Sequence, residues 1–265
     1  MGARPEEWAS GEDYQLYMGR WSRLVAAVFL RRLPPLPAAA WCDVGCGTGA
    51  LTRAILAAER PARVLGVDPS AGYLAVAGAC GADERVAFRV GTASAIPAAD
   101  GEFDRVVSAL VLNFVPDPRA ALAEMVRIAR PAGLVASYLW DYAGGMDMIR
   151  LFWDAAVELD PAAATLDEGR RFPLCQPEPL RELFASAGLA EVRVGQVGVD
   201  TVFTDFEDFW RPFLGGQGPA PGYCSSLPED HRAALREKLC ATTPRNASGA
   251  VPLRARAWTV RGRRP

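Results

Sequence analysis

A glycine-rich turn and the carboxylate that follows it are the residues whose types and spacing could do chemistry. The turn reads DVGCGTG over residues 43–49, between a predicted strand and a predicted helix, and Asp68 ends the next predicted strand, 23 positions after Gly45. Glycine lets a backbone turn sharply or approach a ligand closely, and the N-terminus of a helix presents free amides. A carboxylate at the end of the second strand can accept hydrogen bonds from both hydroxyls of a ribose. The pattern therefore predicts a nucleoside-binding unit.

The spacing of the glycines bears on which nucleoside is bound. They stand at 45, 47 and 49, as GxGxG, whereas the dinucleotide fingerprint is GxGxxG, which seats a pyrophosphate on the helix. Taken alone, the turn leaves S-adenosylmethionine (SAM) and a dinucleotide both open. An ordinary tight turn in an α/β core is the third interpretation, and Asp68 makes it the least favoured.

The elements that must position these residues alternate along the first 140 residues. Apolar runs bounded by turn residues predict strands, and apolar residues at helical spacing predict helices. Strands are expected over 38–44, 63–67, 86–90, 105–109 and 134–139, and helices over 20–32, 49–58, 70–80 and 118–129. Such alternation predicts βαβ units with right-handed crossovers and a parallel sheet.

The pattern changes after residue 140. Helices are expected over 146–159 and 178–187, and strands over 191–199 and 254–260. The segment 203–250 is rich in aromatic residues and contains GGQGPAPG, and it is long for a plain loop. It is predicted to be a lid or a structural cover over the sheet edge. One domain is expected over 1–265, with a helical N-terminal cap over about 10–36.

Five stretches resemble a known family. WCDVGCGTG (41–49) with GVDPS (66–70) is similar to motifs I and II of the class I SAM-dependent methyltransferases, in the subgroup close to the ubiquinone and menaquinone biosynthesis enzymes (methyltransferase type 11). The stretch 91–117 resembles that subgroup's segment that includes strand four, and 127–135 resembles its turn before strand five. YMGRWSRL (17–24) resembles the helix that closes over the cofactor. Beyond residue 140 the resemblance is only architectural.

The resemblance implies a fold and a set of cofactor contacts. The fold is α/β: a doubly wound, Rossmann-like, seven-stranded sheet with an antiparallel last strand and helices on both faces. The cofactor is SAM. Gly45, Gly47 and Gly49 would pack against its methionine part and Asp68 would hold its ribose. Its remaining contacts would come from the closing helix, the glycine turn and the segments after strands two, three and four: Arg20, Asp43, Cys46, Pro69, Ser70, Thr92, Ala93, Ser94, Ser108, Ala109 and Leu110.

The sequence departs from the family pattern at two points. The family commonly has an aspartate that reads the adenine amine where this chain has Thr92. The hydroxyl of Thr92 or Ser94 could accept that hydrogen bond, more weakly than a charged group. A histidine often follows strand four, and Asn113 and Phe114 stand there instead. A histidine base at that position is therefore not expected.

Candidates for acceptor chemistry lie after strand five. Asp141 could act as a general base and Tyr142 as a proton donor, because ligands bind beyond the carboxyl ends of the strands. The alternative for Asp141 is a cap on the next turn. Arg170 and Arg171 could bind an acidic group or pair with neighbouring acids. His231 is expected on an exposed helix start. Aromatic residues that could line an apolar acceptor pocket, or form core, are Phe152, Trp153, Phe209, Trp210 and Phe213.

Composition limits the classes of partner. The formal net charge is −2, which argues against binding nucleic acid through its phosphates. No apolar run approaches the roughly 18 residues of a spanning helix, the N-terminus lacks a signal-peptide core, and the cysteines lack metal or redox spacing. We expect a cytoplasmic protein without a metal, which takes a small-molecule acceptor. A homodimer is left open.

Two other function classes compete with the methyltransferase. One is a nicotinamide-dependent oxidoreductase on a related sheet, against which the glycine spacing and the 108–117 stretch weigh. The other is a SAM-fold protein without methyltransferase activity that acts as a binding module or scaffold. Other methyltransferase subclasses fit less well, because the sequence lacks an NPPY-like tetrad, a double-glutamate loop and a catechol-type metal site.

Overall fold

The structure, a computed structural model, describes residues 15–79, 83–216 and 218–265. Predictions for residues 1–14, 80–82 and 217 lie outside these residues. The chain divides into two compact units. The sheet unit comprises Ser22–Trp140, Leu174–Val197 and Ala257–Pro265, and the helical unit comprises Met1–Trp21, Asp141–Pro173 and Gly198–Arg256. The expectation of one domain stays a prediction.

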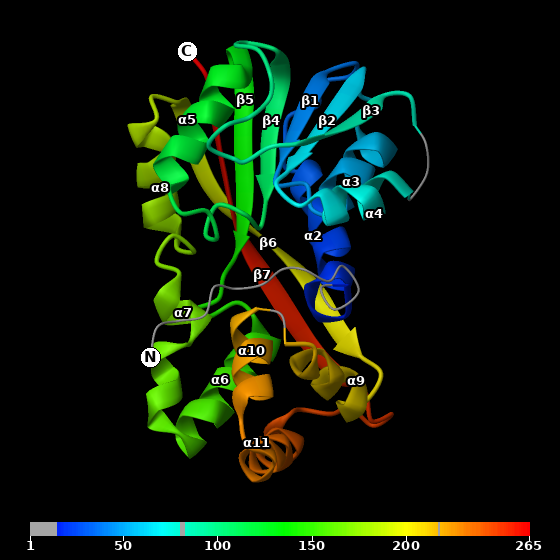
Figure 1. Cartoon of the computed structure of the whole chain (residues 1–265), viewed down its shortest axis with the longest axis vertical. Coiled ribbons are helices and arrows are strands. Elements are labelled where there is room, and N and C mark those ends of the chain that lie inside the picture. Colours follow the sequence, from blue (N-terminus) through cyan, green and yellow to red (C-terminus); the bar gives the residue numbers. More distant parts are fainter. Residues whose placement is uncertain (1–14, 80–82, 217) are drawn as a thin grey trace. The chain divides into compact units, whose positions relative to one another are not determined.

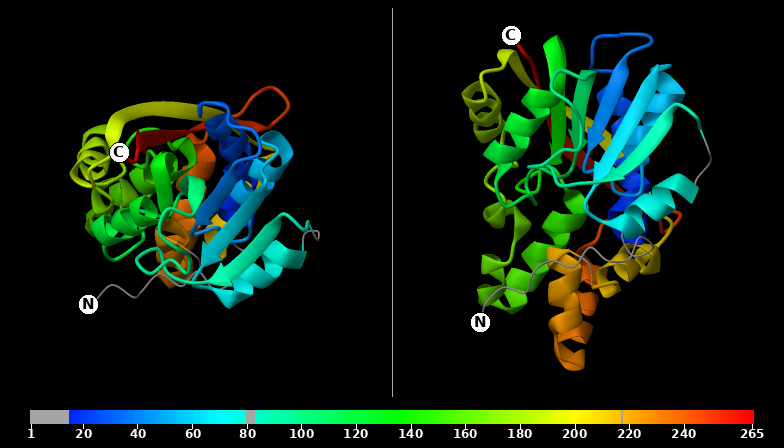
Figure 2. Two further views of the ribbon diagram at one scale, coloured as in Figure 1. Left: turned by 90° about the horizontal axis from the view of Figure 1, so that it is seen from above. Right: turned by 45° about the horizontal axis from the view of Figure 1, so that its top comes forward.

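The strands form a seven-stranded sheet in the order β3-β2-β1-β4-β5-β7-β6 within the described residues. Strand β1 is parallel to β2 and β4, β2 to β3, and β4 to β5, whereas β7 is antiparallel to β5. Figure 1 shows β5, β4, β1, β2 and β3 side by side, and Figure 2 shows them from two further directions. The predicted sheet with its antiparallel last strand is confirmed. The strands are β1 (Ala40–Val44), β2 (Arg63–Asp68), β3 (Val86–Val90), β4 (Phe103–Ala109), β5 (Ala129–Trp140), β6 (Ala190–Phe203) and β7 (Val251–Arg263).

Helices connect the parallel strands. The sheet unit contains α3 (Ala50–Ala58), α4 (Ala71–Ala79), α5 (Pro118–Ile128), α8 (Pro177–Ser186) and most of α2 (Arg20–Leu30). The crossovers through α3 and α4 proceed along the sheet in one direction, and the crossover through α5 proceeds in the other. Because such crossovers are right-handed in nearly all proteins, α3 and α4 lie on one face and α5 on the opposite face.

The reversal of direction occurs between β1 and β4, which are neighbours in the sheet. In open α/β sheets a ligand binds at such a switch point, outside the carboxyl ends of the strands. All five residues of β1 are buried, as are the last five of β2, as expected for strands covered on both faces. The two carboxylates in these strands, Asp43 and Asp68, both lie at the carboxyl ends.

The segment 203–250 belongs to the helical unit, and its role as a lid or a structural cover stays a prediction. Most of its described residues are helical, and its Phe209 and Phe213 are buried in core: their rings meet at 5.6 Å, and Phe213 stacks on Phe152 at 4.4 Å. The pocket-lining interpretation of these three rings therefore gives way to the core interpretation. The unit contains η1 (Gln15–Gly19), α6 (Asp147–Leu159), η2 (Pro161–Thr165), α7 (Glu168–Arg171), α9 (Phe206–Trp210), η3 (Arg211–Leu214), α10 (Pro219–Ser226) and α11 (Glu229–Thr242).

Candidate functional site

Asp43 is a fully buried carboxyl at the end of β1. Its Oδ2 accepts a hydrogen bond of 2.7 Å from the Thr52 hydroxyl in the first turn of α3, while its Oδ1 has no partner among the described residues. Burial raises the pKa of Asp43 to about 7, the charge of Asp68 raises it further, and the Thr52 hydrogen bond opposes the rise. A buried oxygen without a partner is costly, so this carboxyl is suited to a ligand donor.

The glycine turn follows β1 with three residues in the left-handed region, Gly45 at φ 73°, Gly47 at φ 51° and Gly49 at φ 83°. A Cβ on Gly45 would lie 2.5 Å from the side chain of Val111, whereas a Cβ on Gly47 would meet no atom within 4 Å. Gly45 is therefore required for packing against the segment after β4. Gly47 leaves its backbone open on the side where a ligand would approach.

Asp68 links the end of β2 to this turn. Its Oδ2 accepts the Gly47 amide at 2.9 Å and its Oδ1 accepts the Ser70 amide at 2.9 Å. Its carboxyl is 7% exposed, and burial raises its pKa while the two amide hydrogen bonds oppose the rise. Each carboxylate oxygen has a second lone pair, so the group can still accept the two hydroxyls of a ribose.

The other predicted cofactor residues of the sheet unit follow the strands around this point. Cys46 is buried, Pro69 is exposed, and the Ser70 hydroxyl accepts the Tyr73 amide at 3.2 Å and so caps α4. After β3, Thr92 and Ser94 are exposed with their hydroxyl oxygens 3.4 Å apart, and Ala93 between them is half-buried.

The end of β4 contributes further polar groups. Ser108 is fully buried and its hydroxyl has no partner among the described residues, nor does the Asn113 side-chain nitrogen. Ala109 is half-buried, and Leu110 has φ 62° and donates its amide to the carbonyl of Tyr138 at 2.8 Å. SAM carries a ribose and an amino acid end. The unpaired polar groups, the open backbone of Gly47 and the carboxylate of Asp68 fit such a ligand.

Arg20, also predicted to bind the cofactor, belongs to the helical unit. Its Nη1 donates to both oxygens of Asp208, at 3.0 and 3.2 Å, and its guanidinium lies 4.5 Å from the ring centroids of Trp21 and Phe203. Its Nε and Nη2 are buried without partners within the described chain. These two donors could hold a carboxylate. Asp208 and Phe203 were not predicted, because nothing local to Arg20 in the sequence indicates residues so distant.

Asp141 lies in the helical unit directly after β5, and it is 2% exposed. Its Oδ2 accepts Nε of Arg256 at 2.7 Å and also Nη2 of Arg256, and its Oδ1 accepts the Gly144 amide at 3.2 Å. These contacts match the turn-cap alternative, and a base role for Asp141 stays a prediction. Tyr142 is 6% exposed, its ring 5.5 Å from that of Phe172, and its proton-donor role likewise stays a prediction.

Asp141→Asn should destabilise the protein by about 2 kcal/mol. Removing one partner of a fully buried pair costs roughly 3–5 kcal/mol, and the Arg256 side chain is 40% exposed, so solvent offsets part of the loss. The free energy of unfolding, measured in urea, tests this. The double variant Asp141→Asn with Arg256→Met should lose less than the sum of the two single variants, because the two side chains interact. Equal stability of the single variant and the wild type would contradict the pairing.

Other candidates from the sequence lie at exposed positions or in ion pairs. His231 is exposed in the first turn of α11, as expected. Asp167 pairs with Arg150 of α6 rather than with its sequence neighbours Arg170 and Arg171. The described residues contain no group of three or more His, Cys, Asp or Glu side chains that could hold a metal ion. None of their helices is long and apolar enough to span a membrane.

The fold and the site define a nucleoside-binding α/β protein of the methyltransferase type. Residues 42–137 match the family of methyltransferase domains. This segment runs from β1 into β5 and contains the glycine turn, Asp68 and the end of β4. This match confirms the resemblance of these residues to the class I SAM-dependent methyltransferases.

The sequence relatives include named methyltransferases. The chain is 35% identical over 114 residues to the demethylmenaquinone methyltransferase of Renibacterium salmoninarum, a match that covers 43% of this chain and 45% of that enzyme. The chain spans about half the length of the curated relatives it matches.

Solved structures share the fold. A putative methyltransferase from Bacillus halodurans has a TM-score of 0.59 at 15% identity, over 91% of this chain and 98% of that one. Phosphoethanolamine N-methyltransferase 2 of Haemonchus contortus, solved in complex with SAM, has a TM-score of 0.60 at 17% identity, over 96% of this chain and 57% of that one. Similarity at this level of identity concerns the fold.

Proposed function

We propose that this protein is a SAM-dependent methyltransferase that methylates a small, partly apolar molecule on oxygen, carbon or nitrogen. The observation that carries the proposal is the Asp68 carboxylate, fixed by the Gly47 and Ser70 amides beside the open backbone of Gly47. It stands at the carboxyl end of β2, which neighbours β1 at the switch point, where such folds bind their ligands. The SAM complex of the Haemonchus contortus enzyme supports the choice of cofactor.

The residues of the sheet unit would have distinct tasks. SAM, when bound, supplies an electrophilic methyl group on a positively charged sulfonium. Asp68 would hold the ribose, the backbone of Gly45 and Gly47 would face the methionine part, and Asp43 would accept from its ammonium group. Pro69, Ser70, Thr92, Ala93 and Ser94 would surround the adenine. Holding the donor in one orientation and keeping water away is the main contribution of such a site to an in-line transfer.

Two residues of the helical unit are proposed for further tasks. Arg20 would bind the carboxylate of the amino acid end through its unused Nε and Nη2, since a guanidinium matches a carboxylate in charge and geometry. Asp141 is proposed as the residue that receives a proton from a hydroxyl or thiol acceptor. An amine acceptor that binds in its neutral form already offers a lone pair and would need no such base.

Calorimetric titration of the full chain with SAM, with its demethylated product and with NADH tests the proposal. We expect micromolar binding of the two sulfur nucleosides and none of NADH. Radiolabelled SAM should then transfer its methyl group to a partly apolar acceptor. Binding of NADH alone would favour the oxidoreductase. Tight SAM binding without turnover of any acceptor would favour a binding module.

A further inference from the structure

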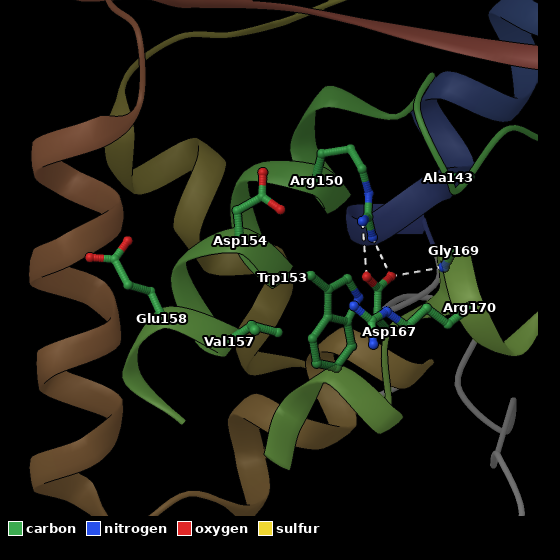
Figure 3. A pocket seen from close by; sticks show the side chains of 9 residues that line it. All are labelled: Ala143, Arg150, Trp153, Asp154, Val157, Glu158, Asp167, Gly169 and Arg170. Carbon is green, nitrogen blue, oxygen red and sulfur yellow. Dashed lines mark hydrogen bonds and ion pairs between the residues drawn. The ribbon is translucent and has the colours of Figure 1, made fainter. Parts of the chain in front are cut away.

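The helical unit contains a cavity of about 520 Å³ that none of the residues proposed for SAM binding or for proton transfer lines. Helix α6 lines one side, and Asp167 with the following residues of α7 lines the other, as Figure 3 shows. Small-molecule sites in proteins typically enclose roughly 300–1,000 Å³. The cavity is therefore large enough for a metabolite, and its lining decides which kind.

Most of the charges at the cavity are already neutralised by partners. Arg150 forms an ion pair with Asp167 through both terminal nitrogens, one of them at 2.9 Å. Glu158 is paired with Lys238 of α11. Paired charges of this kind neutralise each other and define no preference for a charged ligand.

Two opposite charges remain, Arg170 and Asp154. Within the described residues neither side chain has an ion pair or a hydrogen bond, with each other or with any third group. They belong to opposite walls, Asp154 to α6 and Arg170 to α7 (Figure 3). The cavity therefore has one cationic side and one anionic side.

Arg170 and Asp154 are both exposed, and the backbone that carries Arg170 is fixed by a helix cap. Asp167 accepts the Gly169 amide at 2.8 Å and begins α7, which fixes the backbone that carries Arg170. The same carboxylate orients Arg150, whose Nε is buried and has no partner among the described residues. Trp153 lies between the two walls, and its indole N–H is held by Glu168.

The two unpaired charges indicate the kind of ligand that the cavity fits. We propose that this cavity binds a small zwitterion, with a carboxylate or phosphate group on Arg170 and a protonated amine on Asp154. A guanidinium binds either anion in bidentate fashion. The indole of Trp153 and the side chain of Val157 pack against the linker between the two groups.

Calorimetry on the full chain with four probes tests this. 3-Aminopropylphosphonate and γ-aminobutyrate carry both charges, with phosphonate or carboxylate as the anion. Propylphosphonate and propylamine carry one charge each. We expect both or one of the zwitterions to bind, and each single-charge probe to bind at least about tenfold more weakly, a loss of about 1.4 kcal/mol. The tighter zwitterion identifies the anion. Failure of both zwitterions to bind overturns the proposal.

Two variants assign the charges. Arg170→Met should weaken binding of the zwitterion about tenfold or more, and Asp154→Asn should weaken the zwitterion while leaving propylphosphonate unchanged. Arg211→Met and Asp230→Asn are the matched controls, because both residues are exposed in the same unit and outside the cavity. Losses no larger than those of the controls would overturn the assignment. The measurement needs no SAM, so its failure leaves the proposed function untouched.

Discussion

Asp68→Ala should weaken SAM binding about 100-fold or more. The carboxylate would accept two ribose hydroxyls, and a hydrogen bond to a charged group contributes about 1.5–3 kcal/mol. Losing both therefore exceeds the roughly 2.7 kcal/mol that corresponds to 100-fold. Titration of the variant with SAM and with its demethylated product, which share the ribose, should give parallel losses.

A control is needed because Asp68 also accepts the Gly47 and Ser70 amides, so its removal disturbs the turn as well as the ligand. Asp117→Ala is matched to it, since the Asp117 carboxylate accepts the Arg119 and Ala120 amides at the start of α5. Both variants lose two backbone hydrogen bonds. We expect Asp117→Ala to lose about 1 kcal/mol of stability and to keep its SAM affinity. Equal loss of affinity in both variants would contradict a ribose role for Asp68.

The sheet could be predicted from sequence because its signals are local. Apolar strands bounded by turns and the glycines at 45, 47 and 49 determine β1, α3 and β2 within 30 residues. Asp117 caps α5 by contacts of the same short range, since its side chain accepts amides two and three residues ahead. Contacts of this short range can be predicted from the spacing of neighbouring residues.

The boundaries of β5 show where local signals fail. Residues 130–133 read as a turn, RPAG, and the strand was expected from residue 134. In the structure β5 begins at Ala129, with Ala132 at φ 60° and a shift of register against β4 between Phe103 and Arg105. The pairing with β4 passes from Ala129 to Leu134, so residues 130–133 form an irregularity within the strand and only the strand's start was misplaced.

The helical unit was the part that sequence predicted least. Helix α10 reads PAPGYCSS, and α9 has five residues. Helix α10 contains proline and glycine, which are poor helix formers, and a helix as short as α9 depends on packing. Arg256 lies 115 positions from Asp141. No spacing rule connects such residues. The ion pair that Arg256 forms with Asp141, the predicted base, could therefore be found only in the structure.

The second large effect is expected at Glu168. This carboxyl is 1% exposed, its Oε2 accepts the Trp153 indole N–H, and its Oε1 has no partner among the described residues. Burial, assisted by the charge of Asp167, raises its pKa from 4.5 to about 7, although the Trp153 hydrogen bond opposes the rise. The folded protein therefore holds a proton between pH 4.5 and about 7 that the unfolded chain has released.

This difference determines the sign of the pH dependence. Stability falls with rising pH wherever the folded state binds more protons than the unfolded state. Through Glu168 the free energy of unfolding should therefore be greatest below pH 4.5, fall as the pH rises to about 7, and stay level above it. A shift from 4.5 to about 7 corresponds to about 3 kcal/mol. This loss of stability arises only when the Glu168 carboxyl is charged.

Glu168→Gln should accordingly stabilise the protein at pH 8 by about 3 kcal/mol and change little at pH 4.5, because glutamine stays neutral at both. Its amide oxygen can still accept the Trp153 indole N–H. Glu182→Gln is the matched control, since Glu182 is exposed on α8 and should show no such difference between the two pH values. Urea unfolding of both variants and the wild type at each pH measures the effect. A Glu168→Gln protein less stable than wild type at pH 8 would mean that the folded state binds the carboxylate in its charged form. Burial alone would then not explain the pKa of Glu168, and a cation near its carboxylate would have to stabilise the charged form.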